Sequence, residues 1–282
     1  MPRYPISFST LGCPNWSWRT VLDTAARLGY AGIELRGLEG EMDLTKRPEF
    51  SARQIATSIA DLKALDLVVT NLGAGTRLHE AGPAIAVHMD EARRFVDLAH
   101  RLGARWVRVF PDRFVAGEPR ERTIARVGGN LAALGRFARG SGVGILVESH
   151  GEFVESDSLE AMMRAAGDAP GVGILWDTHH TVSAGKEAPA TTWARLGRWV
   201  HHTHLKDSVP APKGVRYVLT GEGTIGVRDV VCVLAAADYK GYYGFEWEKQ
   251  WHPDIADPEV ALPHYAELVG KWLGEAGVAR TL

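Results

Sequence analysis

The sequence predicts a (β/α)₈ barrel, and three observations carry the prediction. The chain has 282 residues, a length that one such barrel commonly occupies. Short apolar and β-branched runs alternate with longer segments whose apolar residues recur at helical spacing. Eight such strand–helix pairs can be counted along the sequence, and strands alternating with helices predict a parallel sheet. No Gly-x-Gly-x-x-Gly turn follows the first strand, which disfavours the alternative of an open doubly wound sheet.

Each strand is predicted from a short apolar, β-branched run. In chain order the strands are predicted over residues 6–10, 32–35, 67–72, 105–110, 143–147, 172–176, 199–203 and 242–247. Each helix is predicted from apolar residues at helical spacing after a strand. The first and third helices stop at Gly29 and Gly103, and a glycine favours a helix end. The helices are predicted over residues 18–28, 48–65, 84–102, 120–139, 158–166, 191–196, 227–237 and 260–276. No linker interrupts the series, so we expect a single domain over residues 1–282.

Composition and charge exclude several classes of function. Lys and Arg number 32 against 34 Asp and Glu, and the net charge of −2 offers no electrostatic footprint for nucleic acid or an anionic membrane. No run of apolar residues is long enough to cross a membrane, and the first residues lack the apolar core of a secretory signal. Cys13 and Cys232 lie far apart and are expected to be reduced thiols. These features predict a cytoplasmic protein.

Ionisable residues end the last four predicted strands. In a (β/α)₈ barrel, active residues come from the carboxyl ends of the strands, so these ends are where function is expected. An acid at the end of a buried strand is costly unless something neutralises it. The four ends read Glu148-Ser-His150, Asp177-Thr-His-His180, His202-Thr-His204-Leu-Lys206-Asp207 and Glu246-Trp-Glu248.

Three carboxylates and one imidazole at these ends would be neutralised by one divalent cation. This donor set suits Mn²⁺, Mg²⁺, Co²⁺ or Zn²⁺. The two cysteines are too far apart in sequence to suggest a thiolate zinc site. The alternative is that each acid forms a salt bridge with an arginine at the rim of the barrel.

A series of short motifs runs along nearly the whole chain. The motifs are Phe8-Ser-Thr-Leu-Gly12, Gly29-Tyr-Ala-Gly-Ile-Glu34-Leu-Arg36, Glu148-Ser-His150, Asp177-Thr-His-His180, His204-Leu-Lys-Asp207, Gly221-Glu-Gly-Thr-Ile225 and Gly241-Tyr-Tyr-Gly-Phe-Glu246. In their order and spacing the chain resembles the xylose isomerase-like TIM-barrel superfamily, and specifically its sugar phosphate isomerase/epimerase group. The resemblance implies a single divalent metal ion bound by Glu148, Asp177, His204 and Glu246, with Glu248 as the rival for the last position.

Such a site supports chemistry at a carbon next to a carbonyl group. The metal polarises the carbonyl and stabilises an enediolate. Glu148 and Glu246 are expected on opposite sides of a small carbohydrate substrate, where one removes a proton and the other returns it. We therefore expect a sugar or sugar phosphate isomerase or epimerase. The alternative is a metal-dependent dehydratase (a lyase) acting on a keto-polyol or a dehydroshikimate-like substrate.

Further residues are expected to contact the substrate. His180 resembles the substrate-contacting histidine of the family, with a role beside a metal ligand as its alternative. His150 either touches substrate or orients Glu148. The other expected contacts come from two cations, which could bind anionic or polar groups, and from two indoles, which could stack on a sugar ring. These residues are Arg108, Lys206, Trp16 and Trp247.

The sequence departs from the ketose 3-epimerase branch of the family at two positions. That branch has a glutamate six residues after its first ligand, where this chain has Val154. It also has an arginine six residues after its ligand histidine, where this chain has Pro210. Assignment to the free-ketose epimerases is therefore not expected. The resemblance also allows a homodimer.

Overall fold

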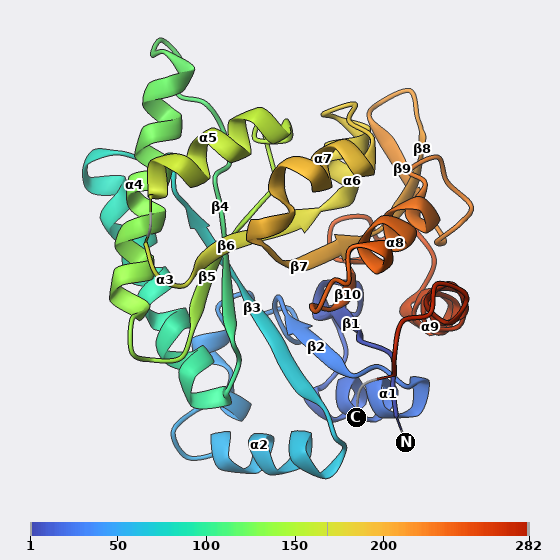
Figure 1. Ribbon diagram of the computed structural model, residues 1–282. Coiled ribbons are helices and arrows are strands. Elements are labelled where there is room, and N and C mark those ends of the chain that lie inside the picture. Colours follow the sequence, from blue (N-terminus) through green and yellow to red (C-terminus); the bar gives the residue numbers. More distant parts are fainter. Residues whose placement is uncertain (1, 168, 281–282) are drawn as a thin grey trace. The chain divides into compact units, whose positions relative to one another are not determined.

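The computed structural model describes residues 2–167 and 169–280. Eight parallel strands close into a barrel in the order β1-β10-β7-β6-β5-β4-β3-β2 (Figure 1). The predicted fold class, a (β/α)₈ barrel, is therefore confirmed. The barrel strands are β1 (Ile6–Ser9), β2 (Gly32–Leu35), β3 (Val68–Arg77), β4 (Trp106–Phe110), β5 (Gly144–Glu148), β6 (Val172–Asp177), β7 (Val200–Leu205) and β10 (Tyr243–Phe245).

Local signals start and stop the helices that alternate with these strands. The Ser17 hydroxyl accepts a hydrogen bond from the Thr20 amide at 3.2 Å and caps α1. Gly29 ends that helix with a φ of 78°, a left-handed conformation that favours glycine. The α-helices that follow predicted strands are α1 (Trp18–Leu28), α2 (Ile55–Ala64), α3 (Gly82–Leu102), α4 (Arg120–Ala138), α5 (Ser156–Ala166), α7 (Pro189–Leu196), α8 (Val227–Ala236) and α9 (Pro258–Glu275).

The structure corrects one predicted helix. A single helix over residues 48–65 was wrong, because a 3₁₀ turn η3 (Pro48–Phe50) ends at Ser51, where the backbone is extended with a ψ of 159°. Helix α2 then starts only at Ile55. An apolar pattern at helical spacing can continue across such a break, because the pattern reports burial and not the backbone angle at one residue.

Two elements near strand ends were not predicted. Helix α6 (Thr178–Ser183) has 6 residues, too few to show a periodic pattern. The antiparallel hairpin β8 (Asp207–Pro210) and β9 (Val215–Val218) lies outside the barrel sheet. Its strands are short and mixed in polarity, so they give little signal in the sequence.

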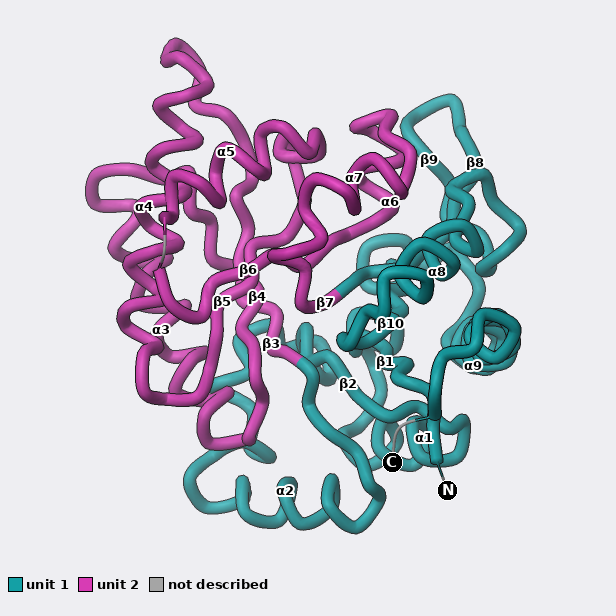
Figure 2. The backbone as a smooth tube through the Cα atoms, in the orientation of Figure 1, with its two compact units in different colours: residues 1–70, 203–282 teal, residues 71–202 magenta. Residues whose placement is uncertain are grey.

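The chain divides into two compact units, which Figure 2 colours separately. Unit 1 comprises residues 1–70 and 203–282, and unit 2 comprises residues 71–202. The expectation of a single domain over residues 1–282 stays a prediction.

The core of unit 1 is built around aromatic rings. Phe8 of β1 meets the edge of Tyr30 at a centroid distance of 4.8 Å. Phe245 of β10 stacks on Tyr265 of α9 at 4.4 Å. Tyr30 also donates to the Leu262 carbonyl at 2.8 Å, so its buried hydroxyl is paired. These contacts attach α9 to the strands β1 and β10.

A close approach between helices organises unit 2. A Cβ on Gly128 of α4 would lie 2.6 Å from the Cβ of Ala165 on α5, so only glycine lets the two helices come this near. On the other side of the unit, Trp176 of β6 packs beside Trp193 of α7 at 6.1 Å. The Trp176 indole donates to the Thr181 hydroxyl at 3.0 Å, which connects β6 to α6.

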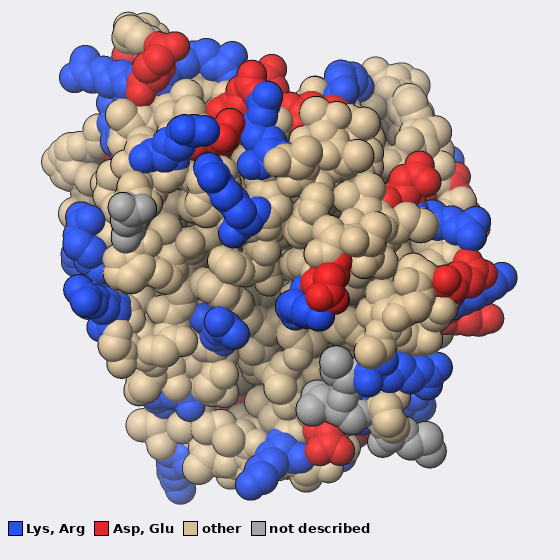
Figure 3. Space-filling model, viewed as in Figure 1, with Lys and Arg blue, Asp and Glu red and all other residues tan. Residues whose placement is uncertain are grey.

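Charge on the visible face is mixed. Figure 3 shows basic and acidic side chains interspersed among uncharged residues, in keeping with 32 basic and 34 acidic residues in the whole chain. Within residues 2–167 and 169–280, no helix has the length and hydropathy needed to span a bilayer.

Candidate metal centre

Glu148 and Asp177 end neighbouring strands of unit 2. In the parallel register Glu148 of β5 lies opposite Leu175 of β6. Asp177 is two residues beyond Leu175, and side chains alternate along a strand, so both carboxylates project from the same face. Their side chains are 2% and 0% exposed. Both strand-end acids are therefore buried, and their role as metal ligands stays a prediction.

Arg108 of β4 accompanies Glu148. Its Nε lies 3.0 Å from Glu148 Oε2, and the side chain is 1% exposed. Its Nη1 donates to the Ala74 carbonyl at 3.0 Å, and the guanidinium lies 4.0 Å from the centroid of the Phe110 ring. The guanidinium therefore holds the carboxylate and the backbone of its own unit. Contact between Arg108 and a substrate stays a prediction.

His150 and His180 gather beside Asp177. The Asp177 carboxylate accepts the His180 amide at 3.2 Å as the N-cap of α6. His180 Nε2 lies 3.6 Å from Asp177 Oδ2, and the His180 side chain is 23% exposed. The His150 ring meets the edge of the His180 ring at 5.1 Å. Within unit 2 the two predicted substrate-binding imidazoles therefore lie together, next to a predicted metal ligand.

In unit 1, β7 and β10 bring a second group together. Leu205 lies opposite Phe245 in the parallel register, so Lys206 follows β7 at the level where Glu246 follows β10. The Lys206 ammonium donates to Glu246 Oε2, and to Glu248 Oε1 at 2.7 Å. His204 Nδ1 lies 3.1 Å from Glu246 Oε2. Glu246 thus contacts both Lys206 and His204. The choice of Glu246 over Glu248 as a ligand stays a prediction.

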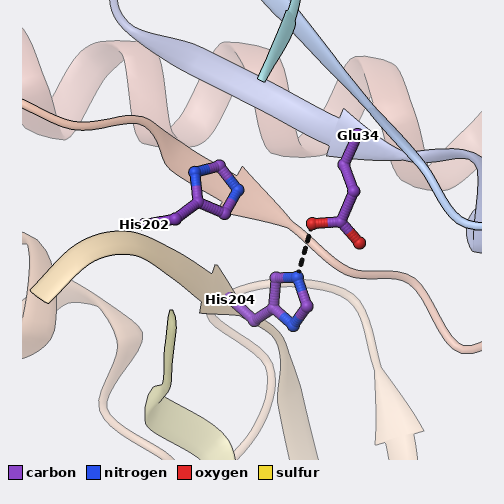
Figure 4. A group of neighbouring side chains, drawn as sticks. All are labelled: Glu34, His202 and His204. Atoms are coloured by element: carbon purple, nitrogen blue, oxygen red, sulfur yellow. Dashed lines mark hydrogen bonds and ion pairs between the residues drawn. The ribbon is translucent and has the colours of Figure 1, made fainter. Parts of the chain in front are cut away.

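Glu34 of β2 belongs to this group, although the sequence analysis did not select it as a site residue. Its Oε2 lies 2.7 Å from His204 Nε2, and both side chains are 1% exposed (Figure 4). His202 precedes His204 by two residues on β7 and completes the cluster that Figure 4 draws. The signal was present in the sequence, because Gly-Ile-Glu-Leu is a short buried strand that carries one acid.

The buried carboxylates and imidazoles of each unit are side chains that can bind a metal cation. In unit 1 three buried carboxylates (Glu34, Glu246 and Glu248) face one ammonium and one imidazole. In unit 2 the buried Glu148 carboxylate lies beside the Arg108 guanidinium, and the buried Asp177 carboxylate lies beside His180. A buried carboxylate is costly unless a positive charge lies near it, and a divalent cation would supply such a charge. Oxygen and imidazole donors are those that Mn²⁺, Mg²⁺, Co²⁺ and Zn²⁺ accept.

The two predicted stacking indoles lie in different environments. Trp247 is 1% exposed, donates to the Ala256 carbonyl at 2.8 Å and stacks on Phe245. Trp16 is half-buried and lines a cavity of about 520 Å³ in unit 1. Its Nε1 donates to Glu259 Oε1 at 3.2 Å. The structure therefore places Trp16 beside open space and Trp247 in packed surroundings, while substrate stacking by either stays a prediction.

The Asp207 carboxylate holds the backbone of the Gly221-Glu-Gly-Thr-Ile225 motif. It accepts hydrogen bonds from the backbone amides of Gly221, Gly223 and Ile225 at 2.9–3.2 Å. A Cβ on Gly223 would lie 2.0 Å from Asp207 Oδ1, so this amide can reach the carboxylate only because the residue is glycine. The motif thus fixes the segment after β9 beside the end of β7.

A comparison with protein-family models decides the family. The model described as a xylose isomerase-like TIM barrel matches residues 22–268. The chain belongs to the xylose isomerase-like TIM-barrel family. Within this family, a segment of 149 residues is 31% identical to an inosose dehydratase of Bacillus cereus (strain AH820). The segment covers 47% of this chain and 49% of that relative, so the chain spans about half the length of the curated relatives it matches.

Solved structures share the fold over nearly the whole chain. An L-ribulose 3-epimerase superimposes with a TM-score of 0.79 at 17% identity, covering 98% of this chain and 96% of that chain. A xylose isomerase-like protein from Mycobacterium smegmatis, in complex with magnesium, gives a TM-score of 0.70 at 16% identity and covers 97% of both chains. Identities this low show the common fold alone.

Proposed function

We propose that the protein is a metal-dependent dehydratase that removes water from a cyclic keto-polyol, with Glu148, Asp177, His204 and Glu246 as the metal ligands. One observation carries the ligand assignment. All four residues are buried: Glu148 and Asp177 end neighbouring strands of unit 2, and His204 and Glu246 lie in contact in unit 1. A set of three carboxylates and one imidazole suits a divalent cation of the Mn²⁺, Mg²⁺, Co²⁺ or Zn²⁺ type.

Two glutamates supply the acid–base chemistry. When bound, the cation polarises the substrate carbonyl and stabilises the negative charge of an enolate. One glutamate, Glu148 or Glu246, takes the proton from the carbon next to the carbonyl. The other gives a proton to the hydroxyl on the following carbon, whose C–O bond breaks. One water leaves, and the product is an unsaturated ketone.

Relatedness favours the dehydratase over the epimerase that the sequence analysis preferred. The curated relatives matched at 31% identity are inosose dehydratases. The two residues that the ketose 3-epimerase branch would require are replaced by Val154 and Pro210. The fold similarity to an L-ribulose 3-epimerase keeps epimerisation as the second candidate, in which the second glutamate returns the proton to carbon instead of to oxygen.

The mass of the product separates the two candidates. The purified protein is incubated with Mn²⁺ and a panel of inososes, dehydroshikimate and free ketoses. The masses of the products are then measured by mass spectrometry. A product lighter than its substrate by one water supports the dehydratase. A product of unchanged mass with deuterium incorporated next to the carbonyl supports the epimerase and overturns the first proposal.

Isosteric substitutions test the two glutamates. Glu148→Gln and Glu246→Gln keep the shape of the side chain and remove the proton acceptor. Each is expected to lower kcat by about 10²–10⁴-fold, the usual contribution of a general acid or base. Glu91→Gln, which changes a carboxylate that holds the Gly75 amide in unit 2, serves as the control. Full activity in both site variants would rule out the two-glutamate mechanism.

A further inference from the structure

Glu34 makes a contact that the reaction itself does not require. It projects from β2, where it lies opposite Ser9 of β1, and it is 1% exposed. Its carboxylate reaches His204 at 2.7 Å. Burying a carboxylate on a barrel strand costs free energy unless a hydrogen-bond donor lies beside it. The short contact with His204 is therefore expected to have a role.

The two ring nitrogens of His204 face different carboxylates. Nε2 faces Glu34 Oε2 at 2.7 Å, whereas Nδ1 faces Glu246 Oε2 at 3.1 Å. An ionised carboxylate only accepts hydrogen bonds, so the 2.7 Å hydrogen bond to Glu34 requires a hydrogen on Nε2. In the neutral imidazole, the form that binds a metal, the lone pair then lies on Nδ1, on the side of Glu246.

We propose that Glu34 is a positioning residue that selects the Nε2–H tautomer of His204 and aims the Nδ1 lone pair at the metal. Glu34 acts through His204 and is not itself a ligand. The inference rests on the proposed function, because it assigns a role around the proposed metal site. A carboxylate that accepts the second N–H of a ligand histidine fixes both the tautomer and the orientation of the ring.

Other groups near His204 do not take this role. Lys206 has no acceptor, and its ammonium is directed to Glu246 and Glu248. His202 lies in the same cluster as Glu34 and His204 and is the other imidazole on β7 beside the carboxylate. A second variant, His202→Gln, therefore separates an effect of Glu34 on His204 from an effect routed through His202.

The first readout needs no metal. Nitrogen-15 shifts of the imidazole rings distinguish a protonated from an unprotonated ring nitrogen, and the loss of one ring in His204→Gln assigns His204 among the 11 histidines. In the metal-free wild type we expect the hydrogen on Nε2. In Glu34→Gln the tautomers should mix, because an amide can both accept and donate. His202→Gln and the control Glu91→Gln should leave the His204 tautomer unchanged.

The second readout is metal affinity. The Kd for Mn²⁺, measured by titration calorimetry, should rise about 10–100-fold in Glu34→Gln and stay within about twofold in Glu91→Gln. If Glu34→Gln does not fold, Glu34→Asp is used, which keeps a carboxylate one methylene shorter and should raise the Kd while Nε2 stays protonated.

The outcomes separate the two proposals. An unchanged tautomer and an unchanged Kd in Glu34→Gln overturn the role of Glu34. A changed tautomer, together with a wild type that binds no Mn²⁺, Mg²⁺, Co²⁺ or Zn²⁺, leaves Glu34 as the residue that orients His204. That second result overturns the proposed metal-dependent function and the aim of Nδ1 at a metal.

Discussion

Buried cations hold the strand-end carboxylates at the scale of single residues. Lys206 contacts Glu246 and Glu248 in unit 1, and Arg108 contacts Glu148 in unit 2. Taking such charges out of water is costly, and their mutual attraction offsets this cost only while both partners are present. These pairs therefore set the positions of the carboxylates, and the loss of one partner should be more damaging than the loss of both.

Replacement of Lys206 tests this reasoning. Lys206→Met leaves two buried carboxylates without their cation, and we expect a loss of about 3–5 kcal/mol in the free energy of unfolding. The double variant Lys206→Met/Glu248→Gln removes one of the stranded charges and should recover part of that loss. Urea titrations followed by circular dichroism measure both values. Equal stability of Lys206→Met and wild type would contradict the pairing.

The two cysteines differ in exposure, and this predicts their reactivity. Burial raises the pKa of the Cys13 thiol far above its usual value, so little thiolate is present at neutral pH. Cys232 on α8 is exposed. A maleimide reagent should label one thiol per native chain and two per unfolded chain, as counted by mass spectrometry. Native Cys232→Ser should take up no label, and labelling of Cys13 in that variant would be the contrary result.

At the scale of elements, polar groups fix the segments that follow the barrel strands. Asp207 binds three backbone amides of the segment that returns from β9. In unit 2, Glu118 binds both terminal nitrogens of Arg126 at 2.7 Å and the Thr123 hydroxyl at 2.7 Å. These contacts attach the loop between β4 and α4 to the first turns of α4.

The Glu118 contacts predict a dependence of stability on pH. Hydrogen bonds from Arg126 and then Thr123 lower the pKa of Glu118 to about 2, from an ordinary value of 4.5. A lowered pKa means that the folded state favours the ionised form, so the stabilisation is present above pH 4.5 and is lost as pH falls toward 2.

Glu118→Gln measures that contribution. Its melting temperature should lie below that of the wild type at pH 7, and the two values should converge as pH falls below the ordinary carboxyl pKa. Differential scanning calorimetry across this pH range gives both curves. A constant gap at all pH values would show that the charge of Glu118 does not contribute.

At the scale of the whole molecule, metal binding and folding stability are linked. A cation that binds only the folded state stabilises it by about 2.7 kcal/mol at a hundredfold excess over its Kd. We therefore expect Mn²⁺ to raise the melting temperature of the wild type. Glu148→Gln/Asp177→Asn/His204→Ala should show no such rise. Elemental analysis of both purified proteins provides the matching metal content. A shift of equal size in both would assign the effect to another site.

Local patterns predicted most of the fold. Helix α1 was predicted with the bounds it has, because Trp18–Leu28 combines apolar spacing with a terminal glycine. Helix α2 was not, because the extended backbone at Ser51 leaves no trace in the apolar pattern. Helix α6 depends on one cap at Asp177, and the hairpin β8–β9 is too short for its pattern to stand out. Signals that depend on several turns of regular structure are readable in a sequence, and those that depend on one residue are not.

The candidate site shows the same division. The acids at the ends of β5 and β6 could be found in the sequence, because charge directly after an apolar run signals a buried ionisable group. The partners of these groups could not be found in this way. Arg108 and Lys206 were predicted as substrate contacts, which stays a prediction, and the structure adds that each contacts carboxylates of its own unit.

The (β/α)₈ class, the order of the elements and the strand ends at which chemistry is expected could all be predicted from the sequence, because alternation and helical spacing are properties of neighbouring residues. The pairing of the buried charges depends on the three-dimensional fold. Glu34 and His204 are 170 positions apart in the chain, yet their side chains meet at 2.7 Å. Nothing local to either residue encodes that contact, since it arises from the register of strands that the closed barrel brings to a common face.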